Sequence, residues 1–131
     1  MNDHPSYVKW GRISTITTAW LFAACVALQV FLAGLATFDA PDGPAHWAEH
    51  VSFGQWIGVL TILLLVFAIA GRLPRMLVAL SALVLVLYGM QYPFANTDAS
   101  SMAALHAVNA LALFSLSIHI GARARTLPSS P

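Results

Sequence analysis

The sequence predicts an all-α integral membrane protein: an antiparallel four-helix bundle with both termini in the cytoplasm. Two observations support this fold class. Only 8% of the 131 residues are charged and 59% are hydrophobic, and the apolar residues fall into four runs separated by polar breaks. Because a soluble domain carries about a quarter charged residues, this chain cannot cover a water-facing surface. We therefore expect its main solvent to be the lipid bilayer.

Each apolar run is long enough for a helix that crosses a bilayer, which takes about 17–25 residues. The runs cover residues 13–38, 51–70, 76–92 and 102–122. The breaks between them, DAPDGP, GRLPR and QYPFANTDAS, have the prolines, glycines and polar residues of turns. Lipid offers the backbone no hydrogen bonds, so the runs must be helices, and short links make neighbouring helices antiparallel. The chain then divides into a cytoplasmic head (1–12), a transmembrane domain (13–122) and a cytoplasmic tail (123–131).

The charged residues predict the orientation of these helices. All the basic residues flank one side of the runs: Lys9, Arg12, Arg72, Arg75, Arg123 and Arg125. The opposite side carries Asp39, Asp42, Glu49 and Asp98. Basic residues gather in cytoplasmic loops of membrane proteins. This rule places both termini in the cytoplasm and predicts a multi-pass protein of the cytoplasmic membrane.

Three histidines in or beside the apolar runs are the candidate functional residues. The stretch AHWAEHVSFGQWIGVL places His46 and His50 one helical turn apart, and LHAVNALALF places His106 in the fourth run. Ionisable groups in membrane spans are costly and mark functional sites. A b-type haem held by two histidines needs one imidazole from each of two facing helices. We predict haem b with His50 and His106 as axial ligands and His46 as a supporting group or alternative ligand.

Small residues beside these histidines favour the same interpretation, because a porphyrin needs room next to its ligands. Gly54 follows His50 by one turn, and Ala110 follows His106 by one turn. The heights of the histidines count against it. At about 1.5 Å per residue, His50 stands about 31 Å above Gly71, whereas His106 stands about 22 Å above Gly121. The outer side also has no Lys or Arg for the haem propionates.

A family likeness is carried by three motifs: QVFLAGLATF (29–38), HVSFG (50–54) and LHAVNALALF (105–114). Together they resemble a family of small four-helix bacterial membrane proteins, which is distantly similar to one half of haem A synthase and to other four-helix b-type cytochromes. In those relatives, histidines near the outer ends of the second and fourth helices ligate haem. The resemblance implies that role for His50 and His106. Only Gln29 stands where the synthase has a carboxylate, and only one half is present, so the synthase activity does not carry over.

Two alternatives stay open. In the first, His46, His50 and His106 join Met90 and Met102 in a copper or zinc site, since imidazole with thioether suits copper. In the second, the chain is a cofactor-free subunit or partner of a larger complex. Possible partners are a second copy or a larger respiratory or haem-handling complex. We expect no nucleic-acid binding, because the basic residues flank membrane segments. The sequence leaves enzymatic activity undecided.

Overall fold

Four helices make up nearly all of the computed structural model, which describes residues 6–39 and 41–128. They are α1 (Ser6–Phe38), α2 (Gly43–Ala70), α3 (Arg75–Ala95) and α4 (Ser100–Arg125). All four are long and apolar enough to cross a membrane. The prediction of an all-helical chain with four candidate spans is therefore confirmed.

The helices extend beyond the apolar runs that predicted them. Helix α1 has 33 residues, or about 50 Å at the usual rise, whereas the apolar layer of a bilayer is about 30 Å thick. It begins at Ser6, inside the predicted head, and α4 ends at Arg125, inside the predicted tail. The apolar run therefore covers only the central part of a longer helix. The backbone hydrogen bonds continue into its polar ends.

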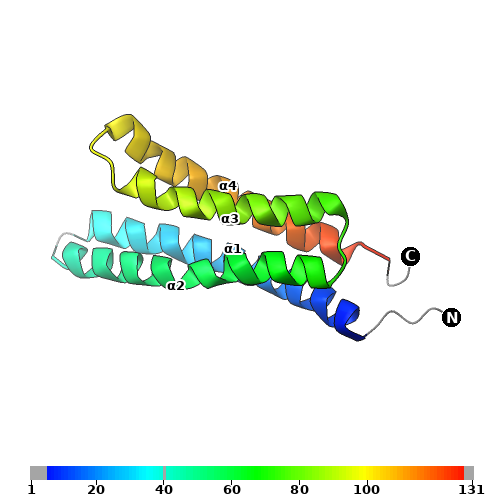
Figure 1. Ribbon diagram of the computed structural model, residues 1–131. Helices are drawn as coiled ribbons and strands as arrows, with labels where there is room; N and C mark the ends of the chain where they lie inside the picture. The colour runs from blue at the N-terminus through cyan, green and yellow to red at the C-terminus, as the bar shows by residue number, and fades with distance from the viewer. Residues whose placement is uncertain (1–5, 40, 129–131) are drawn as a thin grey trace.

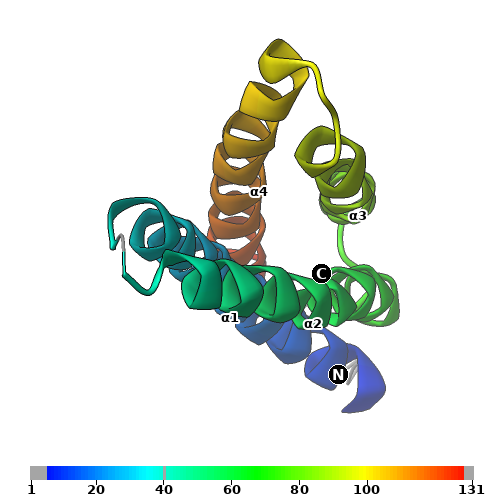
Figure 2. The same cartoon turned by 90° about the vertical axis from the view of Figure 1, so that its left-hand side faces the viewer.

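The helices pack in a ring in which α1 and α3 each contact both α2 and α4. Figure 1 shows the chain turning back at each link, so that α1–α2 and α3–α4 form two helical hairpins. The start of α1 and the end of α4 lie at the same end of the molecule, and the α1–α2 and α3–α4 links lie at the far end (Figure 1). Seen from the far end, the α3–α4 hairpin lies over the α1–α2 hairpin (Figure 2), so that α1 faces α4 and α2 faces α3. Helices α2 and α4 thus occupy diagonal positions.

The two ends of the molecule carry opposite charges. All the Lys and Arg residues lie at the end with the termini, which also holds the α2–α3 link. The carboxylates of the described residues lie at the far end, in or beside the other two links. We call these the basic end and the acidic end. The segregation that the sequence indicated is therefore a property of the folded molecule.

The core lies between the hairpins and mixes large apolar side chains with hydroxyl groups. Phe22, Leu64, Val84 and Leu113 are fully or almost fully buried, one from each helix. Each helix also buries one hydroxyl that donates to a carbonyl of its own helix: Thr15 to Gly11, Thr61 to Gly58, Ser81 to Leu77 and Ser117 to Leu113. These hydroxyls satisfy themselves locally. They fill space between close helices without needing a partner on another helix.

Candidate functional site

Helix α2 begins early enough to carry two histidines ahead of its apolar run. Its first residues are Gly43 and Pro44, which suits the opening turn of a helix. Asp42 is the capping residue, but its side chain makes no capping hydrogen bond. Instead its main-chain carbonyl accepts the N–H groups of Ala45 and His46, at 3.0 and 3.1 Å. This start places His50 in the third turn of α2.

The structure brings His50 and His106 together. Their ring centroids are 6.2 Å apart and their planes are inclined by 60°. Both rings are partly buried. Because α2 and α4 are diagonal in the ring of helices, the two imidazoles reach towards each other across the space between the hairpins. This is the pairing that haem or metal ligation by these two residues requires.

The height mismatch expected from counting residues is offset by a stagger between α2 and α4. Gly71 packs against Gly11 and Arg12 near the start of α1, whereas Gly121 packs against Trp20. Because the Trp20 side chain belongs to a later turn of α1 than Gly11 and Arg12, Gly121 lies higher along α1 than Gly71. That stagger offsets the difference of about 9 Å between the two counts, and the two rings meet at 6.2 Å. The glycines were unequal starting points, so the count misplaced the histidines.

Both imidazoles are held by hydrogen bonds to main-chain carbonyls of the neighbouring helix. His50 Nδ1 lies 3.1 Å from the carbonyl oxygen of Gln29 on α1. His106 Nδ1 lies 3.2 Å from that of Gln91 on α3. A carbonyl can only accept, so each Nδ1 carries the proton and each neutral ring keeps its lone pair on Nε2. Among the described residues, neither Nε2 has a hydrogen-bond partner. Metal-ligating histidines are oriented in this way.

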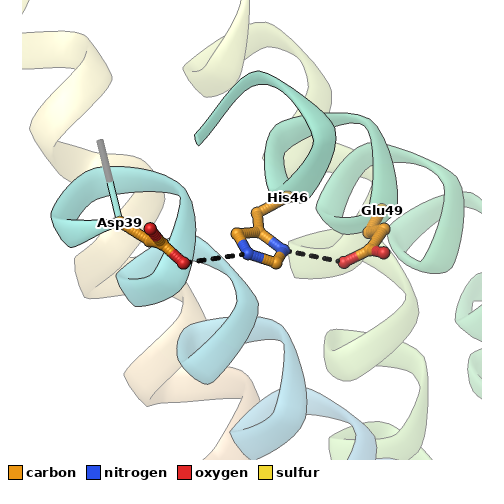
Figure 3. A network of polar contacts seen from close by, with 3 residues as sticks. All are labelled: Asp39, His46 and Glu49. Atoms are coloured by element: carbon orange, nitrogen blue, oxygen red, sulfur yellow. Dashed lines mark hydrogen bonds and ion pairs between the residues drawn. The ribbon is translucent and has the colours of Figure 1, made fainter. Parts of the chain in front are cut away.

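His46 is not part of this pair, although the sequence suggested it as a supporting group or alternative ligand. Its Nδ1 lies 3.0 Å from a Glu49 oxygen, and its Nε2 lies 3.6 Å from an Asp39 oxygen (Figure 3). Both ring nitrogens are therefore directed at carboxylates of the acidic end. The side chain that contacts His50 is instead Trp47, whose ring meets it edge-on at a centroid distance of 5.4 Å.

The room expected beside the histidines is filled by two side chains. The amide nitrogen of Gln29 lies where a Cβ at Gly54 would stand, and a Cβ at Gly58 would come within 2.6 Å of the Tyr88 ring. The Tyr88 hydroxyl donates to the carbonyl of Gly54. Ala110 packs against the main core. In this arrangement the space beside Gly54 is occupied by Gln29, and the role of Gly54 and Ala110 in making room for a porphyrin stays a prediction.

Two polar side chains, those of Asn109 and Gln29, complete the surroundings of the pair. Asn109 Nδ2 donates to the Leu87 carbonyl at 2.7 Å and to Gln91 Oε1 at 3.1 Å. Gln29 Oε1 is buried and has no hydrogen-bond partner within the described part of the chain. Asn109 could have been noticed, since it is the one amide inside the apolar stretch LHAVNALALF. Nothing in the sequence pairs Gln29 with Gln91.

For the copper or zinc alternative, the described residues offer only the pair of His50 and His106 as clustered ligands. Within residues 6–39 and 41–128, no group of three or more His, Cys, Asp or Glu side chains is placed to hold a metal ion. Met90 and Met102, which the alternative also used, are 39% and 43% exposed. A bare ion would therefore have His50 and His106 as its ligands, with the remaining positions filled from elsewhere.

Comparison with known proteins assigns the chain to no characterised function. A family model described as a family of unknown function, DUF6220, matches residues 29–98, which is more than half of the chain. The matched segment includes Gln29, His50 and Gln91 but stops before His106. No curated protein and no solved structure matches the chain.

Proposed function

The chain belongs to the DUF6220 family of unknown function, and we propose that it is an inner-membrane protein that holds one b-type haem between α2 and α4. Its task is electron transfer or haem handling. The protein is an antiparallel bundle with its basic end, and so both termini, in the cytoplasm. A second copy or a larger respiratory or haem-handling complex would act with it.

One observation carries this proposal: two imidazoles from diagonal helices, each fixed through Nδ1, stand at a separation that suits one shared metal. A metal–imidazole bond is about 2 Å long, so two rings on opposite sides of one ion have centroids roughly 6 Å apart. The observed separation is 6.2 Å. The carbonyls of Gln29 and Gln91 orient the rings. The likeness to one half of haem A synthase points to the same two residues.

The two histidines are placed to bind an iron ion, but the Gln29 side chain occupies part of the space that the porphyrin ring would need. The space beside Gly54 is occupied by the end of the Gln29 side chain. This side chain is flexible, whereas packed backbone would not be. Gln29 Oε1 has no donor in the described residues, so little hydrogen bonding opposes a movement of this amide. His50 and His106 would hold the haem, and Gln29 would turn aside for it. When bound, the haem supplies one-electron chemistry at a potential set by its two axial ligands.

The test is the absorbance spectrum of protein purified in detergent from haem-replete cells. We expect a Soret band that is lost in His50→Ala and in His106→Ala, while both variants still insert into the membrane. His46→Ala and His119→Ala are the matched controls and should keep the band, because His46 faces two carboxylates and His119 is exposed near the basic end.

Three outcomes contradict the haem proposal, and each has a different meaning. If both ligand variants keep the wild-type spectrum, the ligand assignment is wrong. A colourless preparation that contains copper or zinc identifies the bare-metal alternative. A colourless, metal-free preparation from the same cells leaves the cofactor-free subunit as the remaining interpretation.

A further inference from the structure

The acidic end is a surface without Lys or Arg among the described residues. It carries Asp42 and Asp98, one in each link, together with Asp39 and Glu49, and all four carboxylates are accessible. Because the α1–α2 and α3–α4 links lie at the same end of the molecule (Figure 1), these charges share one face. His46 is the one group there that can become a cation besides the ligand pair, and it stands between two of the carboxylates (Figure 3).

Trp47 connects this face to the histidine pair. Its side chain is 49% exposed, and its ring touches His50 edge-on. His50 in turn faces His106. The contacts thus run from an exposed aromatic side chain, through one proposed ligand, to the other. Partly exposed tryptophans are frequent anchors of protein interfaces.

We propose that the acidic end is the docking surface for a soluble one-electron carrier protein with a basic face, and that Trp47 is its contact nearest to His50. This inference rests on the proposed function, because a carrier is needed only if the protein exchanges electrons. One electron passes between this protein and the carrier's own metal centre, and no atom or proton is transferred.

Charge complementarity selects the partner. Four carboxylates on one face, with every Lys and Arg at the opposite end, attract a basic protein and orient it before contact. Electron-transfer encounters bury small interfaces and are weak, so such a partner needs only a small docking face. An acidic carrier would be repelled by the same charges.

The test measures binding of a basic c-type cytochrome to the full chain in nanodiscs of phosphatidylcholine, which adds no net lipid charge. We expect binding at low ionic strength that weakens at least about five-fold near 200 mM salt, where the Debye length is below 10 Å. Asp42→Asn with Asp98→Asn should weaken it by a similar factor at low salt. Neither carboxylate pairs with the His46 ring, and the main-chain carbonyl of Asp42 that accepts the His46 N–H is kept in the variant. Trp47→Leu should weaken binding at both salt concentrations, because it removes an apolar contact.

The control variant changes the other end: Arg75→Gln with Arg123→Gln should leave the affinity unchanged. Equal binding of an acidic ferredoxin, or unchanged binding by the Asp42 and Asp98 variant, would overturn the docking surface. A Soret band without cytochrome binding overturns the docking surface and leaves the haem proposal standing. Binding by a colourless protein would show that the acidic end attracts a basic protein, but it would overturn the haem proposal and with it the exchange of electrons at this surface. With haem present, reduction of the cytochrome should slow in the carboxylate variant in proportion to its lost affinity.

Discussion

The two helical hairpins build the histidine pair in the same way but surround it differently. In each hairpin the second helix supplies a histidine and the first supplies a glutamine, and the Nδ1–H of the imidazole is donated to the glutamine's main-chain carbonyl. Those carbonyls lie within helices, and a second lone pair lets each accept a further bond. The orientation of both rings therefore depends on the backbone and not on the glutamine side chains.

The side-chain amides of the two glutamines show the difference. Gln91 Oε1 accepts from Asn109, which follows His106 by three residues. The residue that follows His50 by three is Phe53, which packs against the core and cannot donate. Gln29 Oε1 is accordingly left without a donor among the described residues. A buried acceptor in that state costs about 1–3 kcal/mol. In the second hairpin the glutamine side-chain acceptor has a donor, whereas in the first hairpin, among the described residues, the corresponding acceptor has none and lies beside the proposed haem site.

The largest effect should come from the contact that joins the hairpins, between Gly58 of the first and Tyr88 of the second. Gly58→Ala would place a Cβ 2.6 Å from the Tyr88 ring, and overpacking of this kind costs about 1–3 kcal/mol. Gly89→Ala is the control, since nothing lies within 4 Å of its Cβ position. It should be neutral or stabilise the helix by up to about 1 kcal/mol. Thermal unfolding in detergent checks both, and equal melting temperatures would contradict this packing.

The sequence predicted the helices well because their signal is local. The four apolar runs and the segregation of charge are visible without tertiary structure, and both are present in the fold. The pairing of His50 with His106 was also predicted, although counting from Gly71 and Gly121 argued against it. The stagger of α4 along α1 depends on which glycine meets which side chain, and no residue count contains that information.

The surroundings of the pair could not be predicted, since they depend on contacts between distant residues. Gly54 was expected to leave space, but Gln29 comes from another helix to fill it. His46 was grouped with His50 because both lie on one helical face, but Asp39 and Glu49 draw its ring away. Short-range spacing indicates which side chains share a face. It does not indicate which residues from other parts of the chain contact those side chains.

An intermediate loss of stability is expected when the glutamine of the second hairpin is deprived of its side-chain donor, as the glutamine of the first already is. Asn109→Leu removes the donor to Gln91 Oε1 and to the Leu87 carbonyl. Hydrogen bonds between membrane helices contribute about 0.6–1.7 kcal/mol, so we expect a loss of about 1–2 kcal/mol in unfolding free energy. The carbonyl that orients His106 belongs to the backbone and should survive. Retention of the Soret band at a lower melting temperature would agree with this division of roles, and loss of the band would contradict it.

The smallest expected effect is on stability. The same substitution, Gln to Met, should destabilise the protein in one hairpin and stabilise it in the other. Gln91→Met removes an acceptor that Asn109 uses, so it should destabilise the protein by about 0.5–1 kcal/mol. Gln29→Met removes an acceptor that has no donor in the described residues, keeps the length of the side chain over Gly54, and should stabilise the metal-free protein by a similar amount. Melting temperatures of the two variants in the same detergent test this directly. Destabilisation by both would show that Gln29 Oε1 already has a partner, such as an ordered water, and would remove the distinction between the hairpins.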